Sequence, residues 1–456
     1  MANPTEIVSP ALPIAARGTL REVGLLAYPV ILTQLSATVM GIVDSAMVGR
    51  LGATELAAVG FAGVWSWTVF CLFFGAASGI QTFVAQADGA GRRRECGGWA
   101  WQGLYLIVPT TLLSAAAVWI AAPTLLGWLG PSAELQEAAI RFLRPRLFGI
   151  TGIAIAFVWI SFFRGVGDTR TPLYAAVTAN VVNAVLAYGL IFGKLGLPAW
   201  GVAGAGTATA VGEWIYAAFL AVAFGRSALA ERFATRFVGP RPADIRRLVR
   251  MGIPVGGQWM IDMASFAVFT TLVARMGDTQ MAASQAFVML LSMSFMQAIG
   301  ISVAASTLVG RYIGAEDRQA AIRSFRSAQK FAGILGGAIA ALFLSVPDLL
   351  LRIFTGDPEV ISLGVPLVRL GALFQLLDAF GIVASGSLRG AGDTRWPFLA
   401  QSALAWGLFV PLAYLLGVRL AGGLIGAWIG GTVYAIVLAA TLVYRFQSGA
   451  WQRIRI

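Results

Sequence analysis

The chain has 456 residues, of which 58% are hydrophobic and 12% are charged, and its mean hydropathy is +0.78. A water-soluble fold cannot cover so much apolar surface, so the composition excludes a soluble globular protein and predicts a polytopic membrane protein. A net charge of +12 in such a chain favours basic loops on one side of a membrane, and no nucleic-acid partner is expected.

The chain lacks histidine and contains two cysteines, Cys71 and Cys96. Without histidine, the usual metal ligand and the usual near-neutral proton carrier are both missing, so any proton chemistry falls to carboxylates. The cysteines have no repeated spacing, which predicts neither a disulfide framework nor a zinc site. We expect no cofactor and no enzymatic activity, because no serine or cysteine has an evident base.

Six apolar stretches in the first half are long enough to cross a hydrocarbon core of about 30 Å as helices. They cover residues 25–48, 56–83, 98–121, 138–163, 172–193 and 202–225. We assign residues 1–225 to an N-terminal lobe that contains these six helices. The following segment, 226–250, is amphipathic and rich in arginine, which predicts a basic cytoplasmic linker on an anionic membrane surface.

The second half, residues 251–456, is predicted to form a C-terminal lobe. Its six spans cover residues 252–275, 283–308, 325–346, 362–388, 397–418 and 421–444. A 225-residue shift places Pro29 on Pro254, and RGVGDTRTP at 164–172 on RGAGDTRWP at 389–397. Because each half has an even number of spans, the halves are parallel repeats, a design typical of transporters. The predicted fold is all-α, with twelve transmembrane helices in two six-helix repeats.

Most of the 33 lysines and arginines lie in segments that share one side of the membrane if the N-terminus is inside. The excess of positive charge on the inner side therefore predicts that both termini are cytoplasmic. The loops are short, which favours a multi-pass protein of a bacterial inner membrane. We expect it to act as a monomer in the lipid bilayer. In the paired GDTR turns, Asp and Thr are typical caps of the next helix.

Four acidic residues fall inside the predicted spans: Asp44, Glu213, Asp262 and Asp378. A carboxylate in hydrocarbon costs several kcal/mol, so it usually faces a cavity or a partner and marks a functional site. At the 225-residue shift their counterparts are not acidic, which predicts different chemistry in the two lobes. These counterparts are Phe269, Leu438, Ala37 and Ile153.

Asp262 and Asp378 are expected at a similar depth, each about 15 Å from the inner edge of its helix. If these helices face each other, the two carboxylates share a proton or hold a cation between them, which makes them a candidate coupling site for H⁺ or Na⁺. Asp44 is a separate candidate, on a polar stripe that includes Gln34. For Glu213, a structural hydrogen bond across a helix interface is the favoured interpretation.

Several separated segments resemble the multidrug and toxic compound extrusion (MATE) family. They are YPVILTQLSATVMGIVDSAMVGRLGATELAAVG at 28–60, the paired GDTR turns, and VGRYIGAEDRQAAIRS at 309–324. Segments 180–210, 252–262 and 374–395 are similar to its NorM-like branch. The resemblance implies an antiporter that exports organic cations and drugs in exchange for H⁺ or Na⁺ by alternating access.

The resemblance also matches single residues. Asp44, Asp262 and Asp378 match acids of the family in helices 1, 7 and 10, and Asn183 matches an asparagine of helix 5. Phe374 stands where sodium-coupled relatives have tyrosine, and the missing hydroxyl weakens the case for Na⁺, which binds several oxygens. The expected cavity for small lipophilic cations comprises Gln34, Asn183, Glu213, Gln258, Phe374, Met289 and Met293.

Two other transporter classes share parts of this pattern. A flippase or exporter of lipid-linked or polysaccharide substrates has the same broad architecture, but it would need a basic cavity, whereas the charges inside these spans are acidic. A major-facilitator transporter also has parallel six-helix repeats, but VAQADGAGRRRECGG at 84–98 does not match its usual basic motif. Export of cations is therefore the favoured function.

Overall fold

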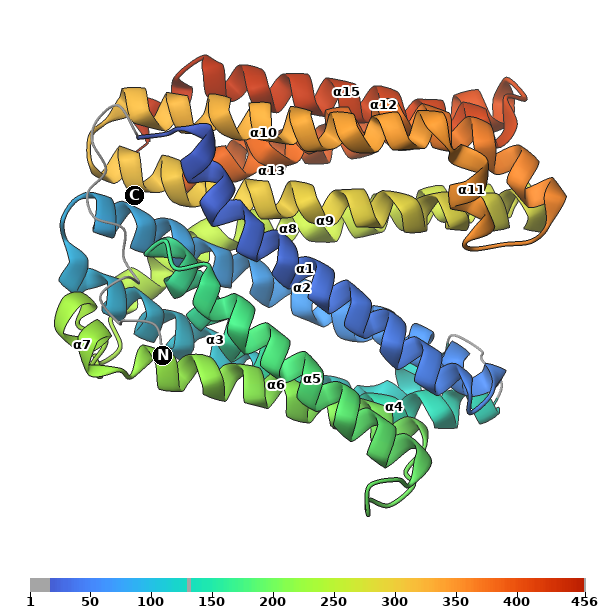
Figure 1. Ribbon diagram of the computed structural model, residues 1–456, viewed down its shortest axis with the longest axis horizontal. Helices are drawn as coiled ribbons and strands as arrows, with labels where there is room; N and C mark the ends of the chain where they lie inside the picture. The colour runs from blue at the N-terminus through green and yellow to red at the C-terminus, as the bar shows by residue number, and fades with distance from the viewer. Residues whose placement is uncertain (1–16, 129–132, 455–456) are drawn as a thin grey trace. The chain divides into compact units, whose positions relative to one another are not determined.

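The computed structural model describes residues 17–128 and 133–454, which form long helices joined by short turns (Figure 1). The first half contributes α1 (Leu20–Gly49), α2 (Ala53–Gly89), α3 (Arg93–Trp128), α4 (Ala133–Gly165), α5 (Arg170–Phe192) and α6 (Val202–Phe224). The second half contributes α8 (Pro242–Ala274), α9 (Asp278–Gly314), α10 (Arg318–Ser345), α12 (Pro358–Gly390), a helical run from Arg395 to Arg419, and α15 (Gly423–Gln447). Short helices α7 (Ser227–Phe233), α11 (Pro347–Arg352) and Ala450–Arg453 complete the chain.

Ten of these helical segments have the length and apolar composition needed to cross a membrane. The two other long helices, α2 and α8, have 37 and 33 residues, which exceeds the roughly 20 residues that a hydrocarbon core requires. No strand occurs in residues 17–128 or 133–454. The predicted all-α polytopic fold with two sets of six long helical segments is confirmed.

Packing divides the chain into two compact units. The N-unit is Leu32–Gly256, and the C-unit joins the described residues up to Ile31 to those from Gly257 onward. The division therefore runs through α1 and α8, so the first turns of α1 belong to the C-unit and the first turns of α8 to the N-unit. Ile31 and Gly256 are themselves related by the 225-residue shift, so both helices are divided at the same point of the repeat.

Glycines allow these exchanged helix ends to pack closely against their neighbours. In the N-unit, a methyl group added to Gly75 of α2 would lie 2.6 Å from the Cα atom of Gly256 in α8. In the C-unit, a methyl group added to Gly300 of α9 would lie 3.0 Å from the backbone nitrogen of Ile31 in α1. The 225-residue shift also places Gly75 on Gly300, so each unit uses the same small residue for the same contact.

The eleventh long segment is not a regular α-helix. It begins as α13 (Arg395–Leu404), continues through a π-helical turn at Ala405–Phe409 and α14 (Val410–Tyr414), and ends in a second π-helical turn at Leu415–Arg419. Pro411 lies in this run and cannot donate a backbone hydrogen bond, which interrupts the regular ladder. Such π-helical turns are frequent at functional sites, and the buried Gln401 of α13 lies one turn before the first of them.

The two GDTR turns have different side-chain contacts. The Asp168 carboxylate accepts hydrogen bonds from the backbone nitrogens of Arg170 and Thr171 at 3.1 and 3.0 Å, which is the expected helix cap. In the second turn, the Asp393 carboxylate accepts a hydrogen bond from Nε of Arg445 at 2.8 Å, which ties the turn to α15. Both contacts support the structural interpretation of the motif.

Part of the basic segment 226–250 packs closely on α3. Side chains of α3 donate hydrogen bonds to the main-chain carbonyls of three residues between 235 and 239. The donors are Trp101, Gln102 and Tyr105, at 3.1, 3.1 and 2.7 Å. The first part of the predicted linker is therefore fixed to the N-unit, and α8 starts immediately after it.

Candidate functional site

In the N-unit, Asp44 is held by a carboxamide. Asp44 lies on α1 and is half-buried, and its two carboxylate oxygens accept hydrogen bonds from Nδ2 of Asn183 on α5 at 3.2 and 3.1 Å. Asn183 is 5% exposed, and its Oδ1 atom has no hydrogen-bond partner among the described residues. One turn earlier on α5, Asn180 donates to the Ser36 hydroxyl of α1 at 2.7 Å. The polar stripe of α1 therefore faces α5.

The other predicted polar residues of the N-unit lie around this pair. Gln34 is half-buried on α1, almost three turns before Asp44. Glu213 of α6 accepts a hydrogen bond from Arg146 of α4, and the two side chains are 13% and 20% exposed. The guanidinium of Arg146 is also close enough to attract the Asp44 carboxylate electrostatically. Glu213 therefore has a fixed cationic partner, whereas Asp44 forms no ion pair within the described residues.

In the C-unit, Asp262 on α8 and Asp378 on α12 are close enough for their carboxylates to repel each other. Both are half-buried, and neither forms an ion pair with a described lysine or arginine. The Oδ1 atom of Asp262 accepts a hydrogen bond from Nε2 of Gln401 on α13. The structure therefore brings together the two acids that the sequence analysis placed at a similar depth.

A phenol completes this group. The Tyr434 hydroxyl on α15 interacts electrostatically with both Asp262 and Asp378, and its ring stacks on Phe409 of the first π-helical turn with centroids 5.2 Å apart. Phe374 meets Trp428 edge to face at 6.1 Å. A hydroxyl group, which Phe374 lacks, is therefore present near the two acids on a different helix.

The remaining predicted cavity residues are placed differently. Gln258, one helical turn before Asp262, is 6% exposed, and its Nε2 atom has no hydrogen-bond partner among the described residues. Met289 and Met293 of α9 are 52% and 56% exposed. They are therefore not core residues.

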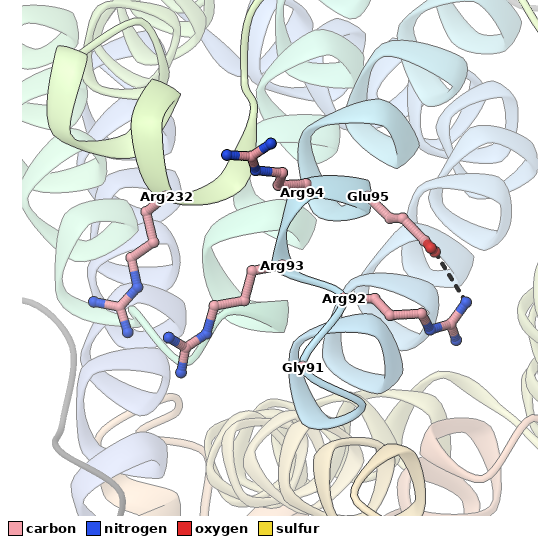
Figure 2. Close-up of a pocket in the computed structure, with 6 residues that line it drawn as sticks. All are labelled: Gly91, Arg92, Arg93, Arg94, Glu95 and Arg232. Atoms are coloured by element: carbon pink, nitrogen blue, oxygen red, sulfur yellow. Dashed lines mark hydrogen bonds and ion pairs between the residues drawn. The ribbon is translucent and has the colours of Figure 1, made fainter.

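None of these residues lines the hollow of about 420 Å³ that is drawn in Figure 2. It is lined by Gly91 and Arg92 of the turn before α3, by Arg93, Arg94 and Glu95 of the first turn of α3, and by Arg232 of α7. Arg92 donates to Glu95 at 3.0 Å, so most of the lining charge is positive. An organic cation would be repelled here, and none of the predicted site residues lines this hollow.

Three functional candidates were missed in the sequence: Arg146, Gln401 and Tyr434. Each lies in a predicted span, and a polar residue in a span is itself a signal for an interhelical contact. The sequence did not indicate which of the many polar residues in the spans would meet an acid, because that depends on the rotation of two helices about their axes.

The chain matches a protein family described as MatE over residues 29–189 and again over 254–415, once in each repeat. It is 29% identical to the probable multidrug resistance protein NorM of Thermotoga maritima, over 95% of this chain and 93% of that protein. It is 30% identical to the multidrug resistance protein PmpM of Pseudomonas aeruginosa, over 98% and 96%. Its fold is similar to a structure titled as the outward-facing conformation of a multidrug resistance MATE family transporter, with a TM-score of 0.89 at 20% identity over 96% and 98% of the chains.

Proposed function

Since this chain belongs to the MatE family, we propose that it is a secondary active antiporter that exports organic cations and drugs in exchange for H⁺ or Na⁺ by alternating access. The names of its relatives as multidrug resistance proteins support this substrate class. The observation that carries the proposal is the set of three aspartates inside long helices. Each has hydrogen-bonding or electrostatic polar neighbours, and none has an ion pair within the described residues.

These carboxylates suit exchange because their charge can be neutralised in two ways. A lipophilic cation is attracted to an unpaired carboxylate in a medium of low dielectric constant. Binding of H⁺ or Na⁺ to the same group removes that attraction, so the substrate leaves. Loss of the ion on the other side of the membrane restores the charge. Asp44, Asp262 and Asp378 are the residues that we assign to this cycle.

The oxygen atoms around Asp262 and Asp378 in the C-unit can bind either coupling ion. The Asp262 and Asp378 carboxylates, the Gln401 carboxamide and the Tyr434 hydroxyl together offer the several hard oxygens that Na⁺ requires. The same two carboxylates can share one proton. Proton binding requires only the two carboxylates, whereas Na⁺ would also use the hydroxyl of Tyr434. Whether transport depends on Tyr434 therefore distinguishes Na⁺ coupling from H⁺ coupling.

The orientation proposed for this exporter follows the distribution of its arginines. We propose that it lies in the inner membrane with both termini cytoplasmic, because the arginine-lined hollow of Figure 2 and the basic segment 226–250 would then be on the inner side. We also propose that it works as a monomer.

Transport in proteoliposomes tests the proposal. Ethidium, a fluorescent organic cation, is loaded and its efflux is followed under an imposed pH gradient and, separately, an imposed Na⁺ gradient. We expect Asp44→Asn, Asp262→Asn and Asp378→Asn each to reduce gradient-driven efflux at least tenfold. Asp348→Asn is the control, because this acid forms an exposed ion pair with Arg352 on α11. Wild-type rates in all three variants would show that these acids do not couple transport.

A further inference from the structure

Each unit contains one aspartate that is held by a carboxamide, and the two pairs are built alike. Asp44 and Asn183 lie on the first and fifth long helices of their half, and Asp262 and Gln401 lie on the corresponding helices of the other half. The two hydrogen-bonded residues are 139 positions apart in the sequence in both pairs. The two contacts therefore have the same sequence separation, although the 225-residue shift does not place one pair of residues on the other.

The second pair is displaced from the first by two helical turns. The sequence interval from Asp44 to Asp262 equals the interval from Asn183 to Gln401, and it is seven residues shorter than the scaffold repeat. Seven residues are close to two turns of an α-helix, about 10 Å along the axis, so the same helix face is kept. The acid and its amide are therefore displaced by the same amount and in the same direction along their helices, which a chance contact of either residue alone does not explain.

We propose that Gln401 is a positioning residue for Asp262, the counterpart in the C-unit of Asn183 in the N-unit, so that each unit carries one aspartate–carboxamide pair for ion coupling. The assignment deepens the antiport function proposed above and rests on it. Gln401 acts through the carboxylate of Asp262, which it holds at the place where Asp378 and Tyr434 also interact with it.

A carboxamide is suited to this role because it has both a donor and an acceptor and carries no charge. Its N–H group donates to the bare carboxylate, and its oxygen is available when the carboxylate carries an ion. An arginine in the same place would hold the charged state permanently, as Arg146 holds Glu213. The buried Gln258, with an Nε2 atom that has no partner among the described residues, is one turn from Asp262 and gives a second polar group at this site.

Another buried glutamine of the C-unit provides a matched control. Gln375 on α12 accepts a hydrogen bond from Ser294 at 2.6 Å and donates to the backbone oxygen of Gly336 at 2.6 Å. Both ends of its amide are hydrogen-bonded to neighbouring helices, and it makes no hydrogen bond to either acid among the described residues. Gln375→Leu therefore removes a buried amide of the same kind that is hydrogen-bonded to Ser294 and Gly336 instead of to the carboxylates of Asp262 and Asp378.

The test uses the full chain in proteoliposomes, with ethidium as substrate and wild type, Gln401→Leu, Gln401→Asn, Gln375→Leu and Asp262→Asn compared. A hydrogen bond to a charged group changes an equilibrium constant by roughly tenfold or more. We therefore expect Gln401→Leu to shift the concentration of coupling ion that gives half-maximal efflux by about tenfold. Gln401→Asn, which keeps a carboxamide, should recover part of the shift, and Gln375→Leu should cause none.

Two results overturn the assignment of Gln401: a wild-type half-maximal concentration in Gln401→Leu, or an equal shift in Gln375→Leu. If Gln401→Leu cannot be purified as folded protein, Gln401→Asn decides alone, and an unchanged half-maximal concentration counts against the assignment. Absence of gradient-driven efflux in the wild type would instead reject the antiport function itself, and an unaffected Asp262→Asn would reject the role of Asp262 in coupling. The two failures are therefore distinguishable.

Discussion

Replacing Glu213, the partner of Arg146, should destabilise the N-unit. The size of the loss follows from the burial of the two side chains. Breaking a buried ion pair from one side costs about 3–5 kcal/mol, because a buried charge remains unpaired. The side chains of Arg146 and Glu213 keep 20% and 13% of their exposure, so partial screening by water places Glu213→Gln near the lower end, at ~3 kcal/mol. The unfolding entropy of a 456-residue chain is roughly 1 kcal/mol per kelvin, so Tm should fall by about 3 °C.

Thermal unfolding of the detergent-solubilised protein, followed by the fluorescence of its 14 tryptophans, measures this shift. Glu137→Gln is the matched control, because Glu137 and Arg141 form a helical ion pair in which both side chains are 66% exposed. Such a pair is worth ~0.5 kcal/mol, which predicts a change below about 1 °C.

The double variant Arg146→Met/Glu213→Met separates an unpaired charge from lost packing. Replacing both partners of a buried pair by apolar residues is often neutral, so the double variant should recover most of the lost Tm. A double variant no more stable than Glu213→Gln would refute the argument, as would an equal loss in Glu137→Gln. Arg146 attracts Asp44 as well, so Glu213→Gln should also slow gradient-driven ethidium efflux by drawing the freed guanidinium towards that carboxylate.

Three further outcomes follow from the contacts described. If Na⁺ is the coupling ion, Tyr434→Phe should raise the Na⁺ concentration that gives half-maximal efflux about tenfold. Proton-driven efflux should stay near the wild-type rate. An unchanged Na⁺ dependence would exclude the hydroxyl as a ligand of Na⁺. Gly75→Ala should destabilise the protein by about 1–3 kcal/mol, because the added methyl group meets the backbone of α8. Gly337→Ala on α10, where no atom of the described residues lies within 4 Å of the new methyl group, should leave Tm unchanged or raise it slightly. Similar losses in both variants would contradict the close-packing argument. These two Tm shifts are read from the same fluorescence melts.

The class of fold could be predicted from the sequence, because it depends on two features that are read along the chain without knowing which helices touch. These features are the apolar runs of span length and the gapless 225-residue repeat. It also predicted that Asp262 and Asp378 would be at a similar depth, because depth follows from counting residues along a helix. The partners of these acids were not predicted, because a hydrogen bond between helices depends on their rotation and tilt, to which hydropathy is insensitive.

The repeat itself concealed the relation between the two amide pairs. At the 225-residue shift, Asp262 is compared with Ala37, so the acids were expected to have no counterpart in the other half. Allowing a displacement of one heptad would have matched Asp262 with Asp44 and Gln401 with Asn183. The exchange of helix ends between the two units was not predicted either, since nothing in the composition of α1 changes at Ile31.

This exchange constrains the order in which the nascent chain can reach its final packing. The first turns of α1 pack against α9 in the C-unit through Ile31 and Gly300. They can form this contact only after the ribosome has synthesised the whole N-unit and most of α9. The N-unit, in turn, is complete only after the beginning of α8 has been made. A gene cut between α6 and α8 would therefore yield two fragments that each lack a structural piece carried by the other, and neither could mature before both are inserted.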